Sequence, residues 1–237
     1  MKRYATAVLC LCCFFILAPG CGQTGEGDDA GTKRQPDPQQ AERPEQPEPV
    51  ALIGDDLGPW KPIQFGGEGE VFMKEGELNL DMGTMTGVQY TGDIKQLFGD
   101  TLENYELTLK AKRVEGLDIF LGLTFPVGEA GHVSLVLGGW GGVVNGISNL
   151  DGANASENKT TTYKEGGYDT GKWYDVRIRV TDKKIGCWLD GKQIVDVNRA
   201  DYSDYDTHGM VLESKPFGLF TYETWGAYKD FKVRQLK

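Results

Sequence analysis

The stretch Gly171–Asp196 reads GKWYDVRIRVTDKKIGCWLDGKQIVD and predicts three antiparallel strands in a meander. In Tyr174–Thr181 and again in Lys184–Leu189, apolar residues occupy every second position. A period of two places one face of each strand in a core and leaves the other in water. The dipeptide Asp190-Gly191 suits the positive φ angles of a tight hairpin, so a third strand is expected at Lys192–Val197.

The chain from Ala51 onward shows the same kind of pattern in many short pieces. It has 33 glycines in 237 residues, about twice the ordinary frequency, and many stand where an alternating run stops. Further strands are expected near Gly69–Lys74, Glu77–Leu80, Gly87–Tyr90, Tyr105–Val114, Asp118–Phe125, His132–Leu137, Val143–Asn149, Phe217–Thr221 and Tyr228–Leu236, with one helical turn at Asp93–Phe98. We therefore predict an all-β fold for residues 51–237, a jelly roll of two antiparallel sheets packed about 10 Å apart.

The alternation also predicts which side chains face inward. The expected core consists of Leu107, Leu109, Ile119, Leu121, Leu123, Val133, Leu135, Leu137, Val176, Ile178, Val180, Ile185, Cys187, Leu189, Leu219, Phe231 and Val233. The opposite faces of the same strands carry Asp118, Phe120, Thr124, His132, Ser134, Arg177, Arg179, Trp188, Phe220 and Tyr222.

The first 21 residues are predicted to be a targeting segment. Lys2 and Arg3 precede the apolar run Ala5–Leu17, which is too short to span a bilayer and is typical of a signal peptide. The run ends in LAPGC at Cys21, which resembles a bacterial lipoprotein box. We expect an exported protein whose Cys21 is lipidated and anchors it to a membrane of the bacterial cell envelope. Ordinary cleavage and secretion is the first alternative, and an uncleaved membrane anchor, which the short apolar run disfavours, is the second.

Residues 22–50 are predicted to be a disordered linker between the leader and the sandwich. The segment is rich in Pro, Gln and Glu and contains no aromatic residue, so it cannot bury enough apolar surface to offset its ordering entropy.

The distribution of the cysteines is consistent with an exported protein that has no network of disulfides. Cys10, Cys12 and Cys13 lie in the leader, which leaves Cys187 without an intramolecular partner once Cys21 is modified.

Charge and composition exclude several classes of function. The formal net charge is −10 and the basic residues are scattered, which argues against nucleic acid as a partner. Only two histidines occur, His132 and His208, so neither a histidine-based zinc site nor a Ser-His-Asp triad is expected. We predict no cofactor. The acidic loops at 201–208 and 149–154 are interpreted as solvated loops, with a weak Ca²⁺ site as the alternative.

The meander and the end of the chain carry a resemblance to a known family. The runs GKWYDVRIRV, CWLDGKQIVD and FGLFTYETWGAYKDFKVRQL resemble segments of the bacterial 3-keto-disaccharide hydrolase domain family, which belongs to the concanavalin A-like lectin/glucanase superfamily. The similarity extends over roughly Leu57–Leu236. It implies a concanavalin A-like sandwich, and an activity in which a base removes the hydrogen beside a sugar ketone.

The motifs associated with that activity are altered here. The family's glutamate and glutamine are absent from the stretch Gly131–Leu135, and its glutamine and histidine are absent from Leu219–Glu223. If the domain is nevertheless a hydrolase with relocated catalytic residues, Asp118, His132 and Glu223 are its candidate bases and electrophiles.

Our main hypothesis is a lectin-like domain that binds carbohydrate and does not cleave it. Aromatic faces stack on the C–H surfaces of sugar rings, while a few amides or carboxylates hold the hydroxyls. The candidate ligand-binding residues are Trp140, Tyr222, Trp225, Trp188, Arg177 and Arg179. Trp173 stands at the position of the family's structural tryptophan, so the resemblance implies that it lies in the core, and Trp60 is expected to close the sandwich near the start of the domain. A structural or protein-interaction lipoprotein is the third hypothesis, and the oligomeric state is left open.

Overall fold

The structure is a computed structural model that describes residues 46–129, 131–207 and 209–237. The predicted leader with its predicted lipidation site Cys21, residues 22–45 of the predicted linker and His208 lie outside the described residues. None of the helices in these ranges has the length and hydropathy needed to cross a membrane.

Within the described ranges, the strands form two antiparallel sheets, as predicted. Sheet A contains, in spatial order, β13 (Lys192–Asn198), β12 (Lys184–Leu189), β11 (Trp173–Val180), β6 (Tyr105–Gly116), β15 (Thr224–Gln235), β4 (Glu77–Leu80) and β3 (Val71–Lys74), and β1 (Val50–Ala51) pairs with β15. Sheet B contains β10 (Thr162–Tyr163), β9 (Val144–Ser148), β8 (His132–Gly138), β7 (Leu121–Pro126), β14 (Gly218–Tyr222), β5 (Met85–Tyr90) and β2 (Trp60–Pro62).

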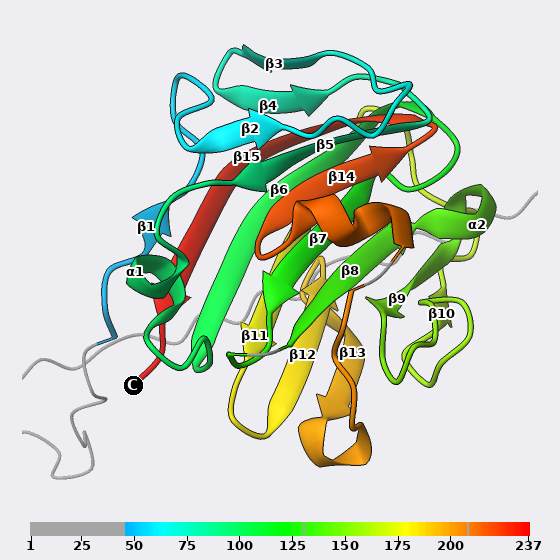
Figure 1. Ribbon diagram of the computed structural model, residues 1–237. Helices are drawn as coiled ribbons and strands as arrows, with labels where there is room; N and C mark the ends of the chain where they lie inside the picture. Colours follow the sequence, from blue (N-terminus) through cyan, green and yellow to red (C-terminus); the bar gives the residue numbers. More distant parts are fainter. Residues whose placement is uncertain (1–45, 130, 208) are drawn as a thin grey trace, which may run out of the picture. The chain divides into compact units, whose positions relative to one another are not determined.

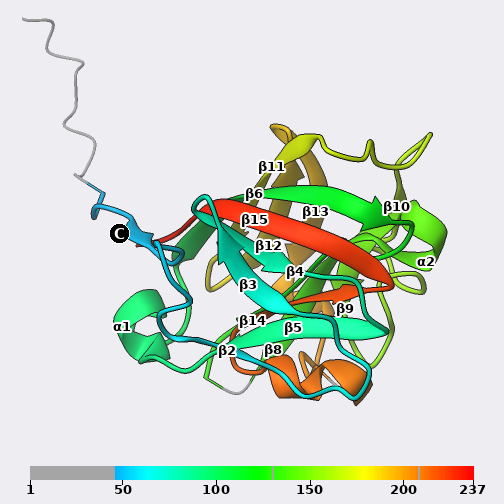
Figure 2. The same ribbon diagram turned by 90° about the horizontal axis from the view of Figure 1, so that it is seen from above.

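The two sheets lie face to face as the layers of one sandwich (Figure 2). Short helical segments connect the strands: α1 (Ile94–Phe98), α2 (Gly139–Gly142), η1 (Arg199–Asp201) and η2 (Gly209–Ser214). The pairing of β1 with β15 brings Val50 into the sandwich, one residue before the predicted start of the domain.

The predicted meander is confirmed. Strand β11 pairs with β12 from Val176–Leu189 to Val180–Ile185, and β12 pairs with β13. Asp190 has φ 47° and Gly191 has φ 78°, so both central residues of the hairpin adopt the left-handed conformation that the sequence predicts. The hairpin fixes the register of β12 and therefore points Trp188 away from the core.

The core lies between the sheets and contains most of the residues predicted for it. Ile119 is an exception, because Phe120 is fully buried in its place. Strand β7 begins only at Leu121, and the irregular segment before it shifts the alternation by one residue. The Phe120 ring packs against Tyr168 and Tyr174, with centroids 4.6 Å and 6.0 Å away.

Trp173 was expected in the core, and this prediction is wrong. Its ring is half-buried on the outer face of sheet A, where the ammonium groups of Lys112 and Lys229 lie 4.3 Å and 4.2 Å from the ring centroid. The next residue, Tyr174, is fully buried instead. Trp60, by contrast, is 3% exposed and packs on Tyr90, Phe217 and Phe231, as expected.

The outer face of sheet B is covered by the chain itself. In Figure 1, η2 lies across β7, β8 and β14. The Ser214 hydroxyl is 2.6 Å from that of Thr124, which is 2.8 Å from that of Ser134, and all three side chains are fully buried. Phe220 lies over Gly122, where a Cβ atom would be 2.2 Å from its ring. Three of the side chains predicted to point outward from this sheet, Thr124, Ser134 and Phe220, are therefore shielded from solvent.

Candidate functional site

One end of the sandwich carries an open pocket of about 590 Å³, which we call the rim pocket. It is assembled from the turn before β5, the end of β6, the segment that leads into β7, the α2 turn and the residue between β14 and β15. The residues that line it are Met82, Gly83, Thr84, Gly116, Leu117, Asp118, Gly141 and Glu223. Two predicted functional carboxylates, from parts of the chain about a hundred residues apart, thus line one pocket.

Asp118 is fixed by three hydrogen bonds. Its Oδ1 accepts from the backbone N–H of Ile119 at 2.9 Å, and its Oδ2 accepts from the backbone N–H of Gly141 at 2.9 Å. Its own N–H donates to Oγ1 of Thr224 at 2.9 Å. Because Gly141 belongs to the α2 turn, Asp118 ties that turn to the wall of the pocket.

The α2 turn, which contributes Gly141 to the pocket, also carries an exposed aromatic residue. Trp140 precedes Gly141 and is 47% exposed, although tryptophan is usually largely buried. Its backbone is left-handed, with φ 50° and ψ 57°. Non-glycine residues in this conformation are strained and concentrate at functional sites. Leu117 and Met82, which line the pocket, are also exposed. The rim pocket therefore combines exposed apolar surface with carboxylates.

Glu223 lies in the tight connection between β14 and β15 and its side chain is exposed. Its backbone has φ 45°, and its N–H donates to the carbonyl of Gly83 at 3.1 Å. Gly116 passes so close that a Cβ atom there would be 2.5 Å from the carbonyl oxygen of Glu223. Tyr222, the preceding residue, is half-buried and donates its backbone N–H to the carbonyl of Ile119 at 3.0 Å.

The third predicted catalytic residue, His132, lies elsewhere. It begins β8, whereas α2 follows the other end of that strand, and six residues of strand span about 20 Å. Its ring is partly buried, and its Nε2 has no hydrogen-bond partner among the described residues. Burial and the charge of Lys215 lower the pKa of His132, which Asp206 partly opposes. The structure therefore brings Asp118 and Glu223 together but places His132 outside their pocket.

The remaining predicted ligand-binding residues lie on the outer face of sheet A. Arg177 stacks on Trp188, with its guanidinium carbon 3.8 Å from the ring centroid. Arg177 and Arg179 both reach Oε2 of Glu106, at 3.4 Å and 2.7 Å. Trp225 is half-buried and donates its Nε1–H to Oδ1 of Asn79 at 3.1 Å. Of the six predicted residues, Trp140 and Tyr222 are sequence neighbours of the pocket-lining Gly141 and Glu223, and the other four lie on the outer face of sheet A.

The two acidic loops predicted from the sequence meet in the structure. Oδ1 of Asp151 accepts from the backbone N–H groups of Ser203 and Asp204, both at 2.8 Å, and from the Ser203 hydroxyl at 3.0 Å. These hydrogen bonds, led by the one from Ser203, lower the pKa of Asp151. No group of three or more His, Cys, Asp or Glu side chains suited to a metal ion occurs in the ranges described above. The Asp151 carboxylate binds the neighbouring loop.

Sequence reasoning named Asp118, Glu223 and Trp140 but missed the residues that complete their surroundings. Leu117 and Met82 lie in irregular segments with no periodic signal, and the closure of the pocket by Gly116 and Gly83 depends on contacts between distant parts of the chain. On sheet A, the alternation in β6 could have identified Glu106 as an outward carboxylate directly opposite Arg179.

Comparison with known proteins gives a family and a fold. The profile of the 3-keto-alpha-glucoside-1,2-lyase-like domain matches residues 48–234. A search of curated proteins finds no match. Among solved structures, a β-glucanase of Bacillus licheniformis is 8% identical, with 82% of this chain and 100% of that chain covered and a TM-score of 0.50. A structure described as a native glycosidic hydrolase is 9% identical, with 80% and 95% covered and a TM-score of 0.50. At such identities the likeness establishes the jelly-roll sandwich alone.

Proposed function

The chain belongs to the 3-keto-alpha-glucoside-1,2-lyase-like domain family, a family of carbohydrate-active domains, and from this membership we propose that it binds a carbohydrate in the rim pocket without cleaving it. The observation that carries the proposal is a pocket lined by the carboxylates of Asp118 and Glu223 and by Gly141, whose neighbour in sequence, Trp140, has an exposed ring.

The pocket supplies the two kinds of contact that a sugar needs. The indole face of Trp140 and the apolar side chain of Leu117 offer surface for the C–H groups of a pyranose ring. Carboxylate oxygens accept hydrogen bonds from sugar hydroxyls, and Glu223 is exposed and available for this. An open pocket of about 590 Å³ has the volume of an ordinary small-ligand site.

Two observations favour binding without catalysis. Elimination beside a ketone needs a base for the hydrogen and a donor for the developing enolate oxygen. The residues that line the rim pocket include two potential bases and the hydroxyl of Thr84, but no Lys, Arg or His that would place a positive charge at the enolate oxygen. In addition, the family's altered motifs correspond to Gly131–Leu135 and Leu219–Glu223, whose strand residues lie in β8 and β14 of sheet B. The outer face of this sheet is covered by Phe220 and Ser214, which leaves little room there for a substrate.

A second candidate function rests on the same pair of carboxylates. Because Asp118 and Glu223 share one pocket, Glu223 could remove the hydrogen beside a 3-keto group, after which the leaving sugar departs with the electrons of the glycosidic bond. Asp118 is less suited to act as the base, since both its carboxylate oxygens already accept backbone hydrogen bonds.

A glycan array followed by a turnover assay separates these functions. We expect the purified protein to bind at least one unmodified glycan and the Trp140→Ala variant to lose that binding. Tyr163→Ala is the matched control, because Tyr163 is 70% exposed on β10 and does not line the pocket. Release of sugar from a 3-keto-disaccharide by the wild type but not by Glu223→Gln would establish the hydrolase instead. The absence of any bound glycan and of turnover would favour the structural lipoprotein.

We further propose that the sandwich is held at a bacterial envelope membrane by a lipid on Cys21. The support comes from the sequence alone: a basic start, a short apolar run and the LAPGC box. The Pro-rich residues that follow would set the distance between the membrane and the sugar-binding domain, up to roughly 90 Å if fully extended.

A further inference from the structure

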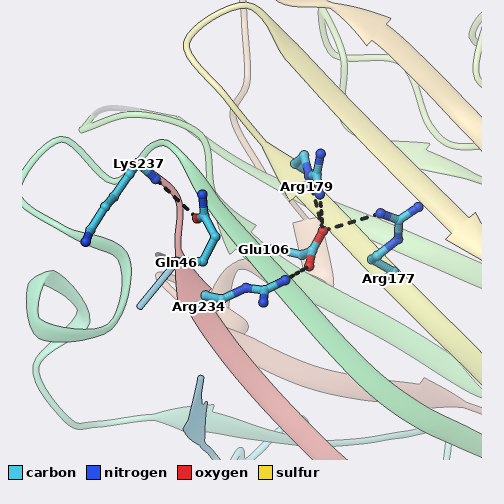
Figure 3. A network of polar contacts seen from close by, with 6 residues as sticks. All are labelled: Gln46, Glu106, Arg177, Arg179, Arg234 and Lys237. Atoms are coloured by element: carbon cyan, nitrogen blue, oxygen red, sulfur yellow. Dashed lines mark hydrogen bonds and ion pairs between the residues drawn. The ribbon is translucent and has the colours of Figure 1, made fainter. Parts of the chain in front are cut away.

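The outer face of sheet A holds three arginines around a single carboxylate. Oε1 of Glu106 accepts from Nη2 of Arg234 at 2.7 Å. Oε2 accepts from Nη2 of Arg179 at 2.7 Å, from its Nε at 3.1 Å and from Nη1 of Arg177 at 3.4 Å. Figure 3 shows the three guanidinium groups converging on Glu106 from neighbouring strands. We call Arg177, Arg179 and Arg234 the arginine cluster.

The cluster carries more positive charge than its carboxylate neutralises. One glutamate offsets one of the three guanidinium charges, so a local excess remains in a chain whose formal net charge is −10. The Glu106 side chain is 5% exposed, whereas those of Arg177, Arg179 and Arg234 are 36%, 43% and 36% exposed. The buried glutamate therefore fixes the arginines from below and leaves part of each guanidinium accessible from solvent.

An aromatic ring is fixed beside this charge. The ring of Trp188 lies over Gly186, where a Cβ atom would be 2.5 Å from it, and the guanidinium of Arg177 stacks on the ring at 3.8 Å. Trp188 lines two open pockets of about 470 Å³ and 430 Å³ on this face. Arg177 lines the first of them and Arg179 the second.

From these contacts we propose that the outer face of sheet A is a second binding site, one for an acidic glycan. The arginine cluster binds the carboxylate or sulfate groups of the glycan, and Trp188 contacts its sugar rings. A guanidinium presents its donors in a planar fork that fits such anions better than a lysine ammonium does. The site is independent of the rim pocket, because the two share no lining residue.

The chemistry of this face fits a glycan better than an anionic membrane. The carboxylates of Asp175, Asp230 and Asp196 line the same pockets and can accept hydrogen bonds from sugar hydroxyls, a contact that an anionic headgroup surface does not use. The large exposed apolar side chains of the described residues also lie elsewhere. They are Val50, Met82, Leu117, Trp140, Tyr163, Met210 and Leu212, and none belongs to β6, β11, β12 or β15.

Calorimetric titration at physiological salt tests the site with polygalacturonate for carboxylate, dextran sulfate for sulfate, and uncharged dextran. We expect at least one of the two acidic polymers to bind and uncharged dextran to bind far more weakly. The polymer that binds more tightly identifies the preferred anionic group, carboxylate or sulfate. Arg177→Gln should weaken binding about tenfold, the size expected when a charge-assisted hydrogen bond is lost. Arg177→Lys should recover only part of it, since it restores the charge without the planar fork.

Lys61→Gln is the matched control, because it removes one charge from β2 on the other sheet. Trp140→Ala should bind the acidic polymer with unchanged affinity. A failure of the rim-pocket proposal can therefore be distinguished from a failure of the site on sheet A. The proposal is overturned if neither acidic polymer binds, if Lys61→Gln weakens binding as much as Arg177→Gln, or if phosphatidylglycerol vesicles bind more tightly than both polymers.

Discussion

Oδ2 of Asp118 accepts a hydrogen bond from the backbone N–H of Gly141 at 2.9 Å, across 23 residues of sequence. This contact joins the segment before β7 to the α2 turn and so fixes the position of Trp140, the residue before Gly141. Asp118 is therefore a positioning residue for the rim pocket.

The first prediction concerns this contact. Asp118→Ala leaves the N–H groups of Ile119 and Gly141 without their carboxylate, which should lower the free energy of unfolding by about 1 kcal/mol, the usual cost of losing a side-chain cap. It should also weaken glycan binding, because the turn that carries Trp140 is no longer tied down. Urea melts and titrations measure the two effects. Asp182→Ala, in the exposed turn between β11 and β12, is the control, and unchanged glycan affinity in Asp118→Ala would contradict the role.

The second prediction concerns the pH dependence of Glu106. Burial alone raises the pKa of Glu106, but hydrogen bonds and charge from Arg179 and Arg234 outweigh it, so the pKa lies below its ordinary value. Because the pKa is lowered in the folded state, the ionised Glu106 stabilises the fold at pH values above the pKa of the unfolded chain, about 4.3. This stabilisation is lost as the pH falls through the pKa of the folded state. Glu106→Gln should cost about 2 kcal/mol at pH 7.

The difference between wild type and Glu106→Gln should shrink as the pH falls below about 4, because the wild-type carboxyl then becomes neutral. Chemical denaturation at several pH values measures it. A difference that stays constant from pH 7 to pH 3 would show that the arginines do not stabilise the ionised form.

The third prediction separates two adjacent aromatic residues. Tyr174 is fully buried, so Tyr174→Ala should lower the free energy of unfolding by about 3–5 kcal/mol, as for other large aromatic side chains lost from a core. Trp173 is half-buried on the outer face, so Trp173→Ala should cost less than about 1 kcal/mol. Denaturant melts of both variants test whether Tyr174 lies in the core and Trp173 on the outer face. A larger loss of unfolding free energy in Trp173→Ala than in Tyr174→Ala would reverse this assignment.

The fourth prediction concerns the anchor. If a lipid on Cys21 holds the protein at the membrane, Cys21→Ser should move it into the soluble fraction, since acyl chains supply the membrane affinity. Cell fractionation with immunoblotting detects the change. Equal partition of Cys21→Ser and wild type into the membrane fraction would disprove the lipid anchor.

The sequence predicted the parts of the fold that depend on local patterns. The hairpin at Asp190-Gly191 could be identified because a two-residue turn has a local signature, and Trp188 and Arg177 could be placed outward because strand alternation is strict. The same alternation puts Trp173 on the face of Asp175 and Arg177. Its assignment to the core, made from family resemblance, overlooked this signal.

Features built from distant segments could not be predicted in this way. The rim pocket joins residues near positions 83, 117, 141 and 223, and no spacing rule relates them. The covering of sheet B by η2 depends on tertiary contacts such as that between Ser214 and Thr124. The exchange of Ile119 for Phe120 in the core follows from an irregular segment, where period-two reasoning does not apply.

The most direct test of the central proposal is a titration of wild type and Trp140→Ala with a glycan selected on the array. The proposal predicts that Trp140→Ala loses binding while its melting temperature stays within about 2 °C of wild type, because an exposed side chain contributes little to stability. Unchanged affinity in Trp140→Ala would contradict binding in the rim pocket. Turnover of a 3-keto-disaccharide that disappears in Glu223→Gln would contradict binding without cleavage.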